Sequence, residues 1–304
     1  MSIPQTVYKG HGTGNDFVIY ADPDGAFEPT PDEIRHLDDR HFGIGGDGLI
    51  RLTHPGNVAD LSAEQVAAFE RDGVEWFMDY RNSDGSLAEM CGNGTRVTAR
   101  FAQIMGYAQN GELFRLGTRA GVKILTSLGA VDGLGEHVFR IDMGAWKAGE
   151  AKEYRVTIPD HQGEACGTYV DMGNPHVVAV LEDHAGRGLA DDATLPAVEQ
   201  LDLTRKPVMD PVIPSDQNAE FVCINAIDET RNQGEAFMRV NERGCGETLS
   251  CGTGLCATAI TLRMLSGIDN WQIAVRGGTL MVNVTDDDVQ LTGDAAIVAS
   301  INLL

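Results

Sequence analysis

The sequence predicts an α+β protein made of two pseudo-symmetric halves, each a mixed β-sheet wrapped around a central helix, with the active site in the cleft between them. Three observations support this expectation. Most segments are short runs rich in Val, Ile, Phe and Thr that end at Gly, Asp or Asn, which is typical of strands. Helical patterns are few. A Cys-Gly-x-Gly motif occurs twice, at Cys91 and Cys251.

In chain order, strands are expected at 17–20, 75–80, 121–127, 138–143, 177–181, 220–224, 235–240, 272–275 and 280–284. Helices are expected at 31–40, 63–71, 94–107 and 254–266, the second of them in an insertion spanning 54–74. The last two helices each follow a Gly-rich turn. In the final helix Cys256, Ile260 and Met264 repeat every fourth residue, which predicts burial over much of its circumference.

The repeated motif divides the chain. The two cysteines are 160 residues apart, and matched positions accompany each of them. Asn15 lies 76 residues before Cys91 and Asn174 lies 77 before Cys251, while Asn82 and Glu242 each stand nine residues before their cysteine. We therefore predict an N-terminal half formed by 1–143 with 294–304, and a C-terminal half formed by 144–293. The segment 183–216, rich in Pro, Asp and Gly, is expected to be an irregular excursion of the second half.

Composition restricts the partners. The chain carries 23 Lys and Arg against 45 Asp and Glu, a net charge of −22. Such a surface repels phosphate backbones and anionic lipid head groups, so nucleic acid and membranes are not expected partners. No run approaches the ~20 apolar residues of a spanning helix, and no secretory signal is visible at the N-terminus. We expect a cytoplasmic protein with a small-molecule substrate.

Each Cys-Gly-x-Gly motif is expected at the N-terminus of a buried helix. The unpaired N–H groups and partial positive charge there favour a thiolate, so we expect a lowered thiol pKa. The glycines would let a ligand carboxylate approach the backbone N–H groups of Gly92, Asn93, Gly252 and Thr253. If the two helix ends face each other, two thiols flank one carbon atom. One can then remove a proton from one face while the other returns a proton to the opposite face.

The other cysteines fit structural roles better. Cys256 falls on the apolar helical stripe, Cys166 and Cys223 lack a matched partner, and Cys245 stays open. Four asparagines occur in turn-like contexts, where local backbone hydrogen bonds explain any single one equally well: Asn15, Asn82, Asn174 and Asn218. Glu242 and Arg243 are adjacent, so one can reach an ammonium group and the other a carboxylate, although a surface ion pair is the simpler reading.

Several runs together resemble the diaminopimelate epimerase family, in order from about residue 7 to the end: GHGTGNDFV (10–18), DRHFGIGGDG (39–48), YRNSDGSLAEMCGNGTR (80–96), GNPH (173–176) and NERGCGETLSCGTG (241–254). The resemblance implies an epimerase without cofactor or metal that interconverts LL- and meso-diaminopimelate for lysine and peptidoglycan precursors. It makes Cys91 and Cys251 the acid and base. It assigns substrate contacts to Asn15, Asn82, Asn174, Asn218, Glu242, Arg243 and the backbone of Gly92, Asn93, Gly252 and Thr253, with His176 beside the reacting centre.

Gly48 stands where many members of that family have Gln, so no side-chain contact is carried over at that position. A homodimer is expected. Two other functions remain open: a proline or hydroxyproline racemase or epimerase with a similar thiol pair, and a non-catalytic duplicated domain that captures small amino acids. The formal G-x-G-x-x-G at 43–48 follows a helical rather than a strand segment, so it does not indicate a dinucleotide site. The histidines and cysteines are not spaced as metal ligands.

Overall fold

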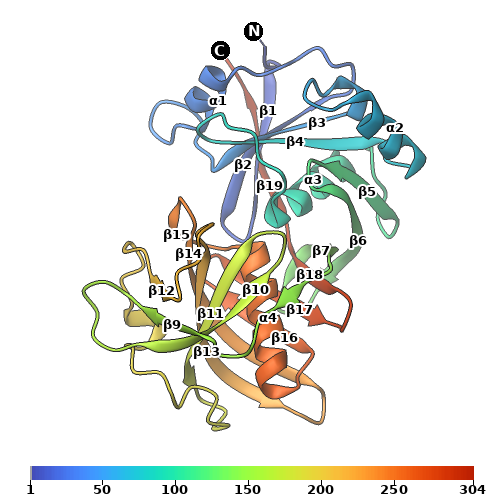
Figure 1. Ribbon diagram of the computed structural model, residues 1–304. Coiled ribbons are helices and arrows are strands. Elements are labelled where there is room, and N and C mark those ends of the chain that lie inside the picture. The colour runs from blue at the N-terminus through green and yellow to red at the C-terminus, as the bar shows by residue number, and fades with distance from the viewer. Residues whose placement is uncertain (1) are drawn as a thin grey trace. The chain divides into compact units, whose positions relative to one another are not determined.

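The computed structural model describes residues 2–304, which form two compact units (Figure 1). Unit 1 comprises residues up to 141 together with 293–304, and unit 2 comprises 142–292. Strands outnumber helices in both units, and parallel and antiparallel neighbours are mixed, so the predicted α+β class is confirmed. No helix of the described chain is both long and apolar enough to span a bilayer.

Unit 1 is built on eight paired strands, and the C-terminal strand joins the N-terminal one. Along the sheet they are β19 (Ala296–Asn302), β1 (Thr6–Gly12), β2 (Asn15–Asp22), β3 (Gly48–Thr53), β4 (Trp76–Asn82), β5 (Leu113–Thr118), β6 (Gly121–Val131) and β7 (Gly135–Gly144). The pairs β2–β3 and β4–β5 are parallel and the others are antiparallel.

The helices of unit 1 begin at well-defined caps. α1 (Pro31–Asp38) and α2 (Ala63–Arg71) each start with a capping box, formed by Thr30 with Glu33 and by Ser62 with Gln65. The short 3-10 helix η1 (Pro55–Asn57) precedes α2. The longest helix of unit 1, α3 (Gly92–Ile104), packs against β1, β2 and β19, and most of its first ten residues are buried. It is therefore the central helix that the repeat predicts for this half.

Unit 2 contains β8 (Lys147–Ala148), β9 (Tyr154–Thr157), β10 (Ala165–Asp171), β11 (Pro175–Asp183), β12 (Val208–Asp210), β13 (Asn218–Asp228), β14 (Gln233–Glu242), β15 (Gly246–Thr248), β16 (Asn270–Val275), β17 (Gly278–Val284) and β18 (Val289–Asp294). From β10 onward the pairs β10–β11, β11–β13, β13–β14, β14–β16, β16–β17 and β17–β18 alternate in direction as in unit 1. Counted from β1–β2 in unit 1 and from β10–β11 in unit 2, the second and fourth pairs are parallel and the other pairs are antiparallel, which shows the internal repeat in the backbone.

The central helix of unit 2 is α4 (Gly252–Ser266), which packs against β10, β11, β13 and β17. Cys256 and Ile260 are fully buried, as the helical stripe predicts, but Met264 is 39% exposed. The prediction is wrong at Met264 because the helix ends two residues later. Gly267, with φ of +78°, forms the left-handed cap there, a conformation that glycine adopts without steric cost.

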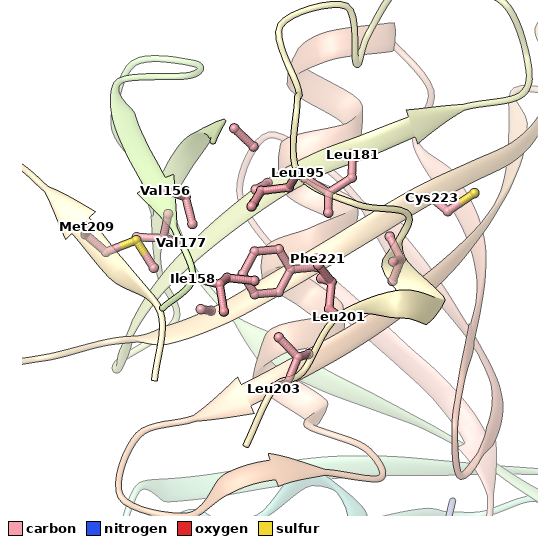
Figure 2. Packing of buried hydrophobic residues seen from close by; sticks show 14 residues of the cluster. Val156, Ile158, Val177, Leu181, Leu195, Leu201, Leu203, Met209, Phe221 and Cys223 are labelled. Carbon is pink, nitrogen blue, oxygen red and sulfur yellow. The ribbon is translucent and has the colours of Figure 1, made fainter. Parts of the chain in front are cut away.

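The segment 183–216 is largely irregular, as predicted, with the short helix η2 (Val198–Gln200) and strand β12. It nevertheless contributes apolar side chains to the core of unit 2. Figure 2 shows Leu195, Leu201, Leu203 and Met209 gathered around Phe221 of β13. Burying each such side chain contributes roughly 1.5–3 kcal/mol to the free energy of unfolding. These apolar contacts therefore hold the segment against the sheet.

Candidate active site

The two cysteines occupy the same structural position in their units. Cys91 is the N-cap of α3, with φ −137° and ψ 120°, and Cys251 is the N-cap of α4, with φ −120° and ψ 114°. At each N-terminus the first N–H groups have no partner inside the helix and carry partial positive charge. In α3 the N–H of Gly94 donates to the Cys91 sulfur at 3.5 Å. Both thiols thus lie next to the partial positive charge of a helix N-terminus.

In unit 1 the structure brings Cys91 next to Asn15 and Asn93. The Cys91 thiol donates to Asn15 Oδ1 at 3.2 Å, and Asn93 Nδ2 donates to the same oxygen at 3.3 Å. Asn15 Nδ2 donates to Asp47 Oδ2 at 2.7 Å, which fixes the orientation of the Asn15 amide. Asp47 in turn accepts from Arg40 at 2.7 Å. The thiol therefore lies at one end of a polar chain that runs to the surface.

The buried guanidinium of Arg96 holds the second asparagine. Its Nη2 donates to Asn93 Oδ1 and to Thr13 Oγ1, both at 2.7 Å, and its Nε donates to the backbone oxygen of Asp294. The bond to Oδ1 leaves Asn93 Nδ2 directed at Asn15. Arg96, Arg40 and Asp47 were not predicted from the sequence, because each also bonds a residue far away in the chain, namely Thr13, Asp16 and Asn15 respectively.

Asn82 is bonded locally instead. It ends β4, and its Nδ2 donates to Ser86 Oγ at 3.0 Å within a turn. Gly48 pairs with Asn82 across β3 and β4. A Cβ at Gly48 would lie 2.4 Å from the backbone oxygen of Arg81 and 2.6 Å from the Tyr80 ring. The strand pairing therefore leaves no room for a side chain at this position, which accounts for the glycine.

In unit 2 the Cys251 thiol lies beside the Glu242 carboxylate, with which it forms a hydrogen bond, and 3.5 Å from Thr253 Oγ1. Glu242 also accepts a hydrogen bond from the Thr248 hydroxyl. Burial raises the pKa of Glu242 above its ordinary value, and the bonds from Thr248 and Cys251 oppose this rise. Glu242 is thus the carboxylate to which the Cys251 thiol donates a hydrogen bond.

The expectation of a lowered thiol pKa is wrong for Cys251. The residue is 6% exposed, and burial raises the pKa of its thiol well above the ordinary value, with Glu242 and Glu220 adding to the rise. Hydrogen bonds from Thr253 and the Gly254 N–H act in the opposite direction. Desolvation and two nearby carboxylates outweigh the helix terminus, so Cys251 is a thiol in this state.

A second buried network lies on the strands beside α4. His176 Nδ1 is 2.7 Å from Glu220 Oε1, both side chains are fully buried, and His176 Nε2 is 3.1 Å from Asn174 Oδ1. Asn174 Nδ2 donates to Thr253 Oγ1 at 3.4 Å. The network therefore links the histidine to the first turn of α4. Glu220 was not predicted from the sequence as part of the site.

Asn218 connects this network to the loop after β14. Its Nδ2 lies 3.4 Å from His176 Nε2, and its Oδ1 accepts from the backbone N–H of Arg243 at 2.9 Å. The Arg243 side chain is exposed and donates to the backbone oxygen of Ser215. Unit 2 thus brings together the predicted residues that it contains, namely Asn174, His176, Asn218, Glu242, Cys251, Gly252 and Thr253, whereas Arg243 joins them only through its backbone N–H. Cys245 is exposed, and Cys166 lies in β10 beside Asp192.

Comparison with known proteins gives a consistent result. A family model described as diaminopimelate epimerase matches residues 7–132 and 168–298. The chain belongs to the diaminopimelate epimerase family. A diaminopimelate epimerase of Streptomyces coelicolor is 38% identical over 310 residues, which covers 98% of this chain and 95% of that protein. One from Corynebacterium glutamicum is 38% identical over 304 residues, covering 96% of this chain and 95% of that protein.

Solved structures at low identity share the fold of this diaminopimelate epimerase family member. A phenazine biosynthesis protein of the PhzF family from Bacillus anthracis superposes with a TM-score of 0.61 at 14% identity, covering 98% of both chains. A probable proline racemase from Agrobacterium radiobacter gives 0.58 at 12% identity, covering 98% of this chain and 92% of that one. The predicted pair of pseudo-symmetric halves is the architecture that these structures share with it.

Proposed function

We propose that this protein interconverts LL- and meso-diaminopimelate with two bases: one of Cys91 and Cys251 removes the α-proton, and the other delivers its own thiol proton to the opposite face. One observation carries the proposal: each cysteine is the N-cap of the central helix of its unit, in a repeated strand arrangement. A single buried thiol at a helix start is ordinary, but two in equivalent positions supply one base and one acid. Inversion at carbon requires one such group for each face of the α-carbon.

Glu242 prepares Cys251 for this chemistry. The thiol proton passes to the Glu242 carboxylate, which leaves a thiolate on Cys251 and a neutral carboxylic acid on Glu242. Burial raises the pKa values of both groups, so the transfer moves one negative charge from one buried group to the other. The thiolate then removes the α-proton. Cys91 supplies a proton to the opposite face as a thiol, and the roles exchange in the reverse direction.

Charge that develops on the substrate carboxylate needs fixed donors, because no electron sink takes part in the proposed reaction. The backbone N–H groups of Gly92 and Asn93 in α3, and of Gly252 and Thr253 in α4, supply them. We assign the remaining substrate contacts to Asn15, Asn82, Asn174, Asn218, Glu242 and Arg243. His176, held by Glu220, positions Asn174 and Thr253. We further propose that the enzyme works in the cytoplasm as a homodimer.

The test measures epimerisation of diaminopimelate and racemisation of proline side by side. The wild-type protein should epimerise diaminopimelate and leave proline unchanged. Cys91→Ala and Cys251→Ala should each lose activity by at least about 10³-fold, since each removes an acid or base outright. Cys166→Ala, a matched thiol outside the site, should keep it. Turnover of proline instead, or full activity in either alanine variant, would refute the assignment. A ligand that binds without α-hydrogen exchange would indicate a binding protein.

A further inference from the structure

Three metal-binding side chains meet at one end of the parallel pair β11 and β13. The strand register places Glu182 beside Cys223, and the backbone N–H of His184 continues the pairing by donating to the Ile224 oxygen at 2.8 Å. His184 lies in the turn that follows β11, and its ring contacts both Glu182 and Cys223. The pairing therefore brings together residues that lie about forty positions apart.

The three donor atoms are close enough to share one ion. His184 Nδ1 lies 3.7 Å from the Cys223 sulfur, whereas Glu182 Oε1 lies 3.7 Å from the other ring nitrogen, Nε2, and only one of the two nitrogens can bind a given ion. One donor atom from each residue falls within 4.8 Å of the other two. Tetrahedral zinc, with bonds of about 2.0–2.3 Å, separates its ligand atoms by roughly 3.3–3.7 Å. Within residues 2–304 this is the one cluster of three His, Cys, Asp or Glu donors.

The carboxylate is held in place and the site is open to solvent. The N–H of Val198 in η2 donates to Glu182 Oε2 at 2.8 Å, which leaves Oε1 for the histidine side. The His184 side chain is 62% exposed, so an ion can enter from water. Figure 2 shows Cys223 at the edge of the apolar cluster, with its sulfur directed away from the labelled side chains.

We propose that Glu182, His184 and Cys223 form a zinc-binding site with a fourth position left for water. A thiolate, an imidazole and a carboxylate suit Zn²⁺, whereas Mg²⁺ and Ca²⁺ prefer oxygen ligands alone. Burial, with the charges of Glu182, Glu199 and Asp183, raises the pKa of the Cys223 thiol to about 11. Binding therefore converts the thiol into a zinc-bound thiolate and releases its proton to solvent.

The site stands apart from the catalytic residues of the same strands. His176 pairs with Asn218 at the start of β11 and β13, six residues before Glu182, which is about 20 Å along a strand. The ion would tie β11 to β13 and, through Glu182, to η2, so its expected role is to stabilise unit 2. Sequence spacing did not indicate these ligands because Cys223 comes from a separate strand.

The test uses the full chain carrying Cys91→Ala and Cys251→Ala, so that the two catalytic thiols do not bind metal. Titration with Co²⁺, a spectroscopic substitute for zinc, should give one thiolate-to-cobalt charge-transfer band per chain. Adding Cys223→Ala should abolish the band, whereas adding Cys166→Ala, a thiol beside a carboxylate in β10, should leave it unchanged. Competition with a chromophoric chelator should show zinc affinity at least about 100-fold weaker without Cys223.

His184→Gln provides a second arm in the same background, because this exposed side chain can be replaced without disturbing the core. It should weaken zinc binding by at least about 10-fold and abolish the rise in melting temperature that zinc produces. Circular dichroism checks that each variant is folded. Absence of the band in the starting protein, its survival in Cys223→Ala, or unchanged zinc affinity in His184→Gln would overturn the proposal. None of these results depends on epimerase activity.

Discussion

Asp38, the last residue of α1, is 4% exposed, and neither carboxylate oxygen has a hydrogen-bond partner among the residues that the structure describes. Burial raises the pKa of this carboxyl from 3.8 to about 7, with Lys9 opposing the rise and Asp16 and Asp47 adding to it. Replacing it by asparagine keeps the shape and removes the ionisable group. Asp38→Asn therefore isolates the cost of one buried charge.

The sign follows from proton linkage. A raised folded-state pKa means that the native protein binds the proton more tightly, so the related stability is fully present below pH 3.8 and is lost as pH rises through about 7. The difference between the two pKa values corresponds to at most about 4 kcal/mol of unfolding free energy, at 1.36 kcal/mol per pKa unit. Asp38→Asn should remove this loss. Its unfolding free energy, relative to wild type, should increase by up to about 4 kcal/mol between pH 4 and pH 8.

The assay is urea unfolding at a series of pH values, with linear extrapolation to water. Asp32→Asn is the matched control, because it lies on the same helix with its side chain 90% exposed. The control should follow the wild-type profile. Parallel stability profiles for wild type and Asp38→Asn across this pH range would show that Asp38 is not a buried, uncompensated acid, and would refute the reasoning.

Three further predictions test the site and the core. Glu242→Gln keeps a hydrogen-bond acceptor for Thr248 but removes the base beside Cys251. In steady-state kinetics kcat should therefore fall by roughly 10²–10⁴-fold with a smaller change in KM. An unchanged kcat would contradict the role of Glu242. In Gly254→Ala the new Cβ would lie 2.6 Å from Glu220 Oε1. This overpacking should lower the free energy of unfolding in urea by about 1–3 kcal/mol and reduce kcat. Unchanged stability and kcat would contradict the tight packing. Phe221→Ala should lower the unfolding free energy by about 3–5 kcal/mol, because its fully buried ring fills the unit 2 core, and a loss below 1 kcal/mol would contradict that placement.

Local signals predicted much of the fold. The expected helix at 63–71 matches α2, and each expected strand overlaps an observed one. Ten of the nineteen strands observed within residues 2–304, β1 and β3 among them, were not predicted. β3 contains Arg51, whose charge breaks the strand pattern, yet this side chain is 1% exposed and pairs with Asp22 at 2.8 Å. Its partners come from β2 and β4, so only the folded sheet explains a buried arginine there.

The candidate site, like the fold, was predicted only in part from the sequence. The repeated motif located Cys91 and Cys251, because helix N-termini leave a readable glycine pattern. It did not locate Glu220, which directly precedes the apolar run 221–224 of β13 and is buried against His176. Burial of Cys251 is the main reason why the expected direction of its pKa was wrong, and Glu242 and then Glu220 add to the rise. Burial and neighbouring charges both depend on strands that lie far away in the sequence.

The origin of the transferred proton tests the two-cysteine mechanism most directly. The enzyme is equilibrated in D₂O and given protiated LL-diaminopimelate, and both isomers are analysed at low conversion by mass spectrometry. Two bases predict that nearly every meso product molecule carries one solvent deuterium at the inverted carbon while the recovered substrate keeps its hydrogen. Meso product that retains the original hydrogen would show that one group serves both faces, and would contradict the account.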